Sequence, residues 1–231
     1  MAVKDRIARV GIELEGGWMV VPPGERCERD GSVIFLPEAG KIAPINKGEI
    51  ISRPLLRSEM RSWMERSYPS HVNATCGLHV HMSFRHHHIN YMRLMTPAYT
   101  EAIVRGLARW AAHESLPPTH PLWDRLGKRD HHHCAHQYLG DQQVHVDHKD
   151  YHSRGKPHSR YTAINYCFKL HKTLECRILP MFDTSDQAVR AVDEVLNITN
   201  MFLATIRLKE TRIQAKVALR SVVRSVYRST V

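Results

Sequence analysis

Gly11-Ile12-Glu13-Leu14-Glu15, close to the start of the chain, alternates apolar residues with carboxylates. Two later stretches repeat this alternation with other polar groups: Gly77-Leu78-His79-Val80-His81 and Leu174-Glu175-Cys176-Arg177-Ile178. Successive side chains of a β-strand point to opposite faces of its sheet. The pattern therefore predicts three strands, each with one apolar face and one face of carboxylate, imidazole or guanidinium groups.

The polar faces of these strands hold metal ligands, whereas an ordinary solvated sheet face would carry lysine, threonine and serine as often. If the strands are neighbours, one cavity gathers Glu13, Glu15, His79, His81 and Glu175. Carboxylates this close repel one another unless cations neutralise them. A ligand set of mostly carboxylates with one or two imidazoles suits Mg²⁺ or Mn²⁺ better than zinc. The pattern thus favours a divalent-metal site over a solvated face.

The composition is that of a globular protein with one sizeable core, with 231 residues of which 42% are hydrophobic and 24% charged. No stretch approaches the roughly 20 consecutive apolar residues of a membrane helix, and the charged N-terminus lacks the apolar segment of a signal peptide. The five cysteines are scattered and none forms a CxxC pair, which indicates reduced thiols. We therefore predict a cytoplasmic protein without a membrane partner.

The formal net charge of +10 favours acidic partners such as nucleotides, phosphorylated substrates or nucleic acid. A basic surface can also serve solubility alone. No recognised DNA-binding motif accompanies the charge, so nucleic-acid binding remains an open alternative.

The remaining segments are expected to belong to the same single domain, residues 1–231. The predicted strands cover residues 7–14, 32–36, 49–52, 77–84, 161–166 and 173–179, with a short hairpin at 18–21. The predicted helices cover residues 55–68, the segment that begins at Thr96-Pro97, the segment behind a capping box of Thr184 and Gln187, and a basic helix at about 211–228. Residues 113–159, rich in histidine, proline, aspartate and arginine, are predicted to be an irregular insertion.

Histidines cluster at His86-His87-His88 and at His131-His132-His133. Only His132, Cys134 and His136 share an alternating face. Structural zinc is one interpretation of the second cluster, and a polar or phosphate-facing loop is the other.

Several short motifs occur in an order typical of one family: Gly11-Ile12-Glu13-Leu14-Glu15, Glu49-Ile50-Ile51-Ser52-Arg53-Pro54, Cys76-Gly77-Leu78-His79-Val80-His81, Arg160-Tyr161-Thr162-Ala163-Ile164-Asn165 and Leu174-Glu175-Cys176-Arg177. Together they make the chain resemble the amidoligase family, which belongs to the glutamine-synthetase-like carboxylate–amine ligases. The resemblance spans about residues 7–180. It implies an α+β fold, with a glutamine-synthetase-like antiparallel curved β-sheet and helices packed on its outer face.

The resemblance also implies metal and nucleotide cofactors. Glu13, His79 and Glu175 match the ligands of one ion, the ion that holds the ATP phosphates. Glu15 and Glu49 match ligands of a second ion, nearer the acceptor carboxylate. ATP and about two Mg²⁺ or Mn²⁺ ions are thus the expected cofactors.

Other matched residues would contact the phosphoryl group and the substrate. His81 corresponds to a histidine that contacts the transferring phosphoryl group or the substrate. Arg160 and Arg177 match arginines that neutralise phosphate and carboxylate charge, in catalysis and in ATP binding. Asn165 ends a matched motif and is expected among the catalytic residues.

Asp30 and Ser32 correspond loosely to a polar pair near the active site, expected on the cofactor side. The chain is far shorter than glutamine synthetase and has no obvious equivalent of its N-terminal domain. The ammonia-handling parts of that enzyme are not recognisable either. The resemblance therefore concerns the catalytic sheet and not glutamine formation itself.

The expected function is an ATP- and divalent-metal-dependent ligase that forms an amide from a carboxylate and an amine through an acyl phosphate. Amino acids, peptides and modified nucleobases all offer suitable substrate groups. One alternative is a metal-dependent phosphotransferase of the same superfamily, and another is a metal-dependent nucleic-acid hydrolase. Assembly into a homo-oligomer also stays open at this level.

Overall fold

The computed structural model describes residues 5–36, 42–85, 93–94, 96–128, 134, 162–167 and 172–206. In this part of the chain the elements are β1 (Ile7–Trp18), β2 (Cys27–Glu28), β3 (Asn46–Ile51), α1 (Arg57–Ser67), β4 (Gly77–Phe84), α3 (Pro97–His113), α4 (Pro121–Gly127), β5 (Ile164–Cys167) and β6 (Thr173–Pro180). A further helix covers residues 185–206. The protein is therefore of the α+β class, as predicted.

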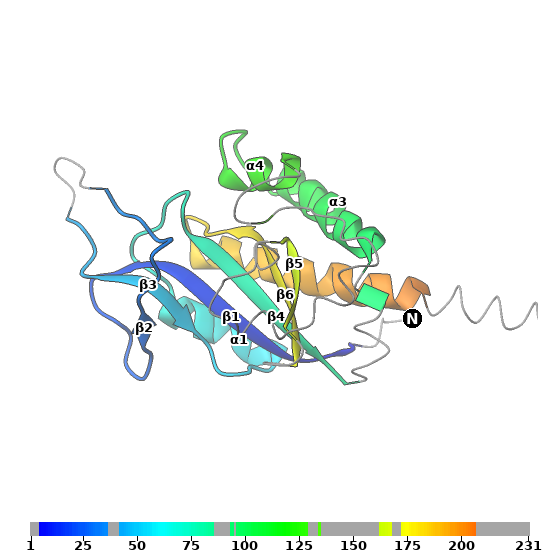
Figure 1. The fold of residues 1–231 in the computed structure, drawn as a ribbon, viewed down its shortest axis with the longest axis horizontal. Coiled ribbons are helices and arrows are strands. Elements are labelled where there is room, and N and C mark those ends of the chain that lie inside the picture. The colour runs from blue at the N-terminus through cyan, green and yellow to red at the C-terminus, as the bar shows by residue number, and fades with distance from the viewer. Residues whose placement is uncertain are drawn as a thin grey trace, which may run out of the picture.

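The six strands form one antiparallel sheet in the order β2-β3-β1-β4-β6-β5 (Figure 1). Glu13 of β1 lies opposite His79 of β4, and His81 of β4 lies opposite Glu175 of β6. The three strands predicted from their alternation are thus direct neighbours at the centre of the sheet.

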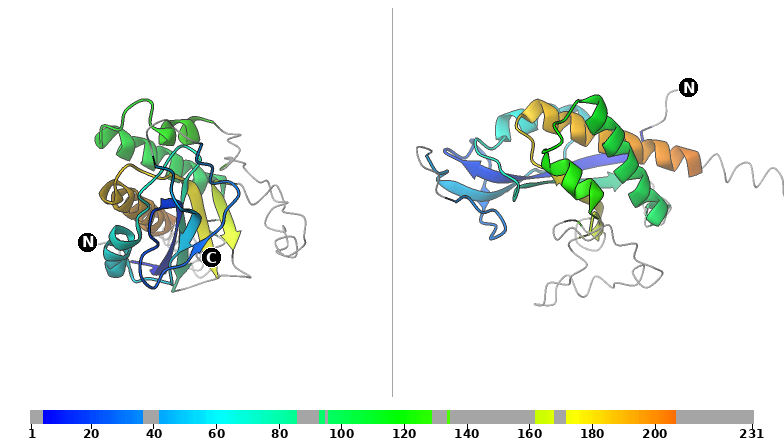
Figure 2. Two further views of the ribbon diagram at one scale, coloured as in Figure 1. Left: turned by 90° about the vertical axis from the view of Figure 1, so that its left-hand side faces the viewer. Right: turned by 90° about the horizontal axis from the view of Figure 1, so that it is seen from above.

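The two faces of this sheet differ in the way that the alternation predicts. The apolar side chains of β1 and β4 are buried on the face covered by the helix of residues 185–206, where Thr199 Oγ1 lies 3.6 Å from Met82 Sδ. α1 lies on the same side, because Arg57 Nε donates to Asp193 Oδ1 over 2.9 Å (Figure 2, right). The polar side chains are left on the opposite face.

Both predicted helix caps form. Thr96 Oγ1 accepts a hydrogen bond from the Tyr99 N–H at 3.3 Å, and Pro97 follows as the first residue of α3. Thr184 Oγ1 accepts from the Gln187 N–H at 3.2 Å at the start of the last described helix. α3 then packs against that helix, and the hydroxyls of Tyr99 and Thr199 lie 2.6 Å apart.

The strand predicted over residues 7–14 continues to Trp18, and no hairpin forms at 18–21. Gly16 and Gly17 do not end the strand, because their missing side chains make room for prolines. A Cβ on Gly16 would lie 2.5 Å from Pro69 Cβ, and one on Gly17 would lie 2.4 Å from Pro44 Cγ. The strand therefore pairs with β3 up to Trp18 instead of turning back on itself.

The strand predicted over residues 32–36 is wrong. The backbone of Ile34 forms hydrogen bonds with side chains and not with a neighbouring strand. The Ile34 N–H donates to Thr75 Oγ1 at 3.2 Å, and Asn73 Nδ2 donates to the Ile34 carbonyl at 2.7 Å. The edge strand β2 forms instead at Cys27–Glu28, where it pairs with β3.

The irregular segment predicted over residues 113–159 is wrong at its start, because α4 occupies Pro121–Gly127. Seven residues span two turns, too few for a helical period to stand out in the sequence. Residues 129–133 and 135–159 of that segment lie outside the described residues, as does the helix predicted at about 211–228.

Arg125 of α4 is buried and joins this helix to the sheet. Its Nη1 donates to the Leu179 carbonyl at 2.8 Å and its Nη2 to the Cys76 carbonyl at 3.1 Å, so it links the start of β4 to the end of β6. Among the helices described above, none combines the length and apolar character needed to cross a bilayer.

Candidate metal centre

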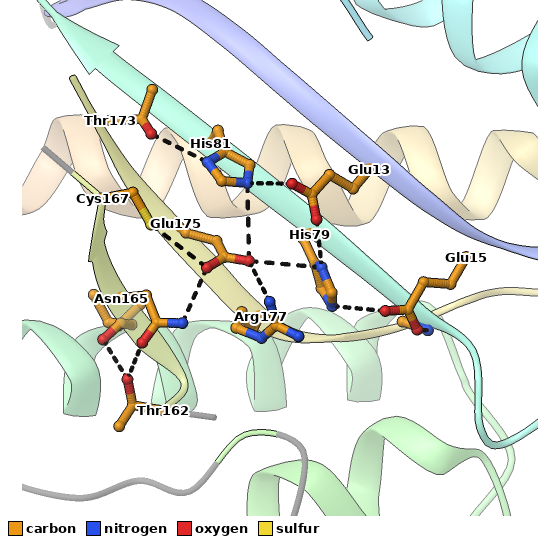
Figure 3. Close-up of polar contacts among 12 residues, drawn as sticks. Glu13, Glu15, His79, His81, Thr162, Asn165, Cys167, Thr173, Glu175 and Arg177 are labelled. Carbon is orange, nitrogen blue, oxygen red and sulfur yellow. Dashed lines mark hydrogen bonds and ion pairs between the residues drawn. The ribbon is translucent and has the colours of Figure 1, made fainter. Parts of the chain in front are cut away.

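Three neighbouring strands place Glu13, His79 and Glu175 together on the polar face of the sheet (Figure 3). One ligand atom from each lies within 4.8 Å of the other two. His79 Nδ1 is 2.8 Å from Glu13 Oε2 and 3.6 Å from Glu175 Oε1. We call these three residues the first ligand set; they are the residues that the family resemblance implies as ligands of one ion.

His81 contacts the same Glu13 carboxylate from the next position on this face of β4. Its Nε2 lies 2.8 Å from Glu13 Oε1, and its Nδ1 lies 3.1 Å from Thr173 Oγ1. A carboxylate can only accept hydrogen bonds, so both imidazoles donate to Glu13. Burial raises the pKa of Glu13, but the hydrogen bonds and charges of His79 and His81 outweigh it and hold that pKa well below its ordinary value.

The proton on His81 is stabilised by the carboxylates around it. Burial lowers the pKa of His81, but the hydrogen bond to Glu13 and the charges of Glu175 and Glu13 raise it above the ordinary value overall. A protonated imidazole here carries positive charge to the centre of the polar face, beside the first ligand set. It could thus attract a phosphate or carboxylate group of a ligand.

Glu175 is only 1% exposed and is held from several directions. Arg177 Nη1 donates to Glu175 Oε1 at 2.7 Å, and Asn165 Nδ2 donates to Glu175 Oε2 at 3.0 Å. Burial raises the pKa of Glu175, while the charges of Arg177, His81 and His79 lower it below its ordinary value overall. Glu175 is thus kept ionised in the core, in the form that can bind a cation.

Two further residues fix the environment of Glu175. Thr162 Oγ1 contacts Asn165 Oδ1, which leaves the Asn165 amide nitrogen directed at Glu175. Cys167 Sγ lies 3.8 Å from Glu175 Oε2. Burial and the Glu175 charge raise the pKa of Cys167 above its ordinary value, so it remains a thiol.

A second ligand set lies beside the first and consists of Glu15, Asp30 and Glu49, again with ligand atoms within 4.8 Å of one another. Glu15 and Glu49 are opposite each other in the β1–β3 pair, and the loop after β2 brings in Asp30. Burial and the charges of Glu13, Asp30, Glu15 and Glu28 raise the pKa of Glu49 to about 7. Crowding among carboxylates therefore costs free energy that a bound cation would relieve.

The residues present fit divalent cations of the Mg²⁺ or Mn²⁺ kind. Five carboxylates and one imidazole make up the two sets, and hard cations of this kind prefer oxygen ligands. Gly77 leaves the space in which the sets meet, since a Cβ there would lie 2.7 Å from His79 Nε2 and 2.9 Å from Glu15 Oε2. Together with Arg177 and His81, the arrangement could bind polyphosphate through cations.

The structure thus brings most of the predicted site residues together: Glu13, Glu15, Asp30, Glu49, His79, His81, Asn165, Glu175 and Arg177. Ser32 lies beside this group but not in either ligand set, and its N–H donates to Asp30 Oδ1 at 2.8 Å. Arg160 lies outside the described residues.

Sequence reasoning missed Arg125, Thr162, Cys167 and Thr173, which all border the site. Arg125 was missed because residues 113–159 were predicted to be irregular. Pro121, a favoured first residue of a helix, was the signal in the sequence that a helix begins there. Thr162 lies in a quoted motif, but nothing in the sequence shows that its hydroxyl faces Asn165. Asp30 was predicted near the site and not as the third member of the second ligand set.

Comparison of the chain with protein-family models, with curated proteins and with solved structures found no match. The resemblance to the amidoligase family therefore rests on the motifs themselves.

Proposed function

We propose that the protein is an ATP- and divalent-cation-dependent ligase that joins a carboxylate to an amine on a glutamine-synthetase-like sheet. One observation carries the proposal: two adjacent ligand sets share one sheet face and have Arg177 bound to the first. Two cations at such a face would neutralise the phosphates of ATP and the carboxylate to be activated. The motifs that resemble the amidoligase family supply Arg177 and every member of the two sets except Asp30.

The proposed reaction needs activation because a carboxylate does not condense with an amine in water. The γ-phosphoryl group of ATP moves to a carboxylate oxygen, ADP leaves, and the amine nitrogen then displaces phosphate to form the amide. Glu13, His79 and Glu175 would hold a cation at the ATP phosphates, and Glu15, Asp30 and Glu49 a second one near the acceptor carboxylate. These cations would offset the negative charge that gathers as the phosphoryl group moves.

The groups around the ligand sets suit the remaining tasks. The Arg177 guanidinium lies 2.7 Å from Glu175 and brings a positive charge to the first ligand set, where it would attract phosphate oxygens. Burial lowers the pKa of Arg177, but the charges of Glu175, Glu13 and Glu15 raise it above the ordinary value overall, so the positive charge is secure. The charge of a protonated His81 would attract the phosphoryl group, and Asn165 holds Glu175 in place.

The test is ADP release with Mg²⁺ or Mn²⁺ and a mixed panel of carboxylates and amines, with free amide product measured in parallel. We expect metal-dependent ADP release that rises with one substrate pair and falls at least about 100-fold in Glu175→Ala and Glu13→Ala. Glu194→Gln is the matched control, a half-buried glutamate on the helix that covers the opposite face. Equal turnover by Glu175→Ala and the parent, or no binding of metal–ATP by the parent, would refute the proposal.

A metal-dependent nucleic-acid hydrolase is the second candidate, favoured by the same pair of ligand sets and by the net charge of +10. Two cations can also stabilise the attacking and leaving oxygens of phosphodiester cleavage. Cleavage of DNA or RNA with Mn²⁺ and without ATP would support this candidate. Phosphorylated product without amide would instead indicate a phosphotransferase.

A further inference from the structure

Arg125 of α4 contacts the backbone of two strands at the point where their pairing ends. Pro180 of β6 lies opposite Gly77 of β4 and has no N–H to donate across the pair. The guanidinium supplies donors there instead: Nη2 donates to the Cys76 carbonyl at 3.1 Å, and Nη1 donates to the Leu179 carbonyl at 2.8 Å. One side chain of α4 therefore holds β4 and β6 together at this end of the sheet.

The peptide group that follows the Cys76 carbonyl also holds a carboxylate of the second ligand set. Its N–H, that of Gly77, donates to Glu15 Oε2 at 2.5 Å. A peptide group is planar, so whatever fixes the direction of its carbonyl also fixes the direction of its N–H. Arg125 and the Met181 N–H both donate to this carbonyl, over 3.1 Å and 3.0 Å. The orientation of the peptide, and with it the position of the Glu15 carboxylate, is thereby determined.

The path from Arg125 to Glu15 is shielded from water along its length. Arg125 is 2% exposed, Cys76 0% and Glu15 4%. The carboxylate packs directly on the peptide, since a Cβ on Gly77 would lie 2.9 Å from Glu15 Oε2. Successive hydrogen bonds in such an environment polarise and strengthen one another. A change at Arg125 should therefore be felt at Glu15.

We propose that Arg125 is a positioning residue of the second ligand set and acts on Glu15 through the Cys76–Gly77 peptide. That Glu15 serves a cation rests on the proposed function, whereas the path from α4 to Glu15 does not. Because one oxygen of Glu15 is held by the peptide, the carboxylate is kept in one orientation beside Asp30 and Glu49. A ligand that is already ordered binds a cation more tightly, since less ordering is left to the binding step.

The positive charge of Arg125 acts in the opposite direction, because it repels a cation. Arg125→Lys separates the two effects. Lysine keeps the charge, but its ammonium group lacks the planar fork that reaches two carbonyls at once. A loss of position without a loss of charge should weaken the second set. Arg125→Met removes the donors and the charge together, and it avoids the cost of burying a lysine charge if that prevents folding.

The amide signal of Gly77 tests the path in the metal-free protein. Cys76-Gly77 is the only Cys-Gly pair in the sequence, so ¹³C-carbonyl cysteine with ¹⁵N-glycine singles out this amide by nuclear magnetic resonance. We expect its proton to move upfield by at least about 0.5 ppm in Arg125→Lys and Arg125→Met, because the bond to the carboxylate weakens. Arg57→Lys is the matched control; Arg57 joins α1 to Asp193 on the other side of the sheet, and the signal should stay in place. An unmoved signal in either folded Arg125 variant overturns the proposal.

Mn²⁺ affinity tests the consequence for the second set. Free Mn²⁺ is followed by electron paramagnetic resonance in Glu175→Gln, where the second set is intact, and in Glu49→Gln, where the first set is intact. We expect added Arg125→Lys to weaken the second set about 10-fold and to leave the first set unchanged. An unchanged second set, or equal weakening of both sets from a general loss of structure, overturns the positioning role. Failure of the parent to bind Mn²⁺ overturns the cation sites of the proposed function, while the amide signal still decides whether Arg125 positions Glu15.

Discussion

Three glycines near the β2–β3 end of the sheet differ in what the backbone requires of them. Gly48 has a φ of +148°, and a Cβ there would lie 1.8 Å from the Glu28 carbonyl oxygen. Gly24 has a φ of +82° but open space around it, and Gly31 has open space without a left-handed φ. Alanine substitutions at the three positions can therefore separate the loss of stability caused by a left-handed backbone from the loss caused by a collision of the new Cβ.

Alanine at these positions should give a graded loss of stability. We expect Gly48→Ala to lower the free energy of unfolding by about 3 kcal/mol, from strain and collision together. Gly24→Ala should cost about 1 kcal/mol from the left-handed φ alone, and Gly31→Ala should change stability by less than about 0.5 kcal/mol. Urea denaturation measures all three. Equal losses at Gly48 and Gly24 would show that the collision with Glu28 relaxes at no cost.

At the scale of elements, α4 has an unusual capping residue. His120 precedes Pro121 and caps the helix, since its Nδ1 accepts from the Leu122 N–H at 3.2 Å. Its ring stacks on Phe182 with centroids 5.1 Å apart. Burial lowers the pKa of His120, and the charge of Asp183 offsets only part of this effect. The helix is therefore capped by a neutral imidazole.

This cap predicts a pH dependence of stability. Because the pKa of His120 is lower in the folded state than its unfolded value of about 6.5, the unfolded chain binds more protons as pH falls through 6.5, and stability is lost. His120→Asn keeps a capping acceptor and does not titrate; losing the ring stack should cost about 1 kcal/mol at pH 7.5. The advantage of the parent over His120→Asn should shrink between pH 7.5 and 5.5. A constant difference in the free energy of unfolding would contradict this.

The helices and strands also show which local sequence patterns were sufficient to predict an element. β1, β4 and β6 alternate over enough residues to be predicted, and the caps at Thr96 and Thr184 mark true helix starts. β2 is two residues long and exists only because β3 pairs with it, so no local pattern could reveal it. Residues 32–36 have strand-like composition but bond to side chains instead.

At the scale of the whole molecule, two helices far apart in sequence meet through a glycine. Gly106 of α3 faces Ile198 of the helix over residues 185–206, and a Cβ at Gly106 would lie 2.3 Å from Ile198 Cδ1. The Tyr99 ring packs on Phe202 nearby, with centroids 5.3 Å apart. The interface therefore requires close approach at one point.

We expect Gly106→Ala to destabilise the protein by about 1–2 kcal/mol, because overpacking outweighs the gain in helix propensity. Ile198→Ala should relieve the collision, so the double variant should be more stable than the sum of the single losses predicts, by about 1 kcal/mol. Thermal and urea unfolding of the parent, the two single variants and the double variant complete this double-mutant cycle. Strict additivity would mean that the two side chains do not meet.

The chain's own sequence determined the polar and apolar faces of three strands, since side-chain alternation is a local property of extended backbone. The alternation predicted that Glu13, Glu15, His79, His81 and Glu175 share one cavity, and the resemblance to the amidoligase family implied that Glu13, His79 and Glu175 are ligands of one ion. Only the tertiary structure decided the strand order, the entry of Asp30 into the second ligand set, and the position of His79 between both sets. These depend on which buried faces pack and in which register, and that is settled by contacts between residues far apart in the chain.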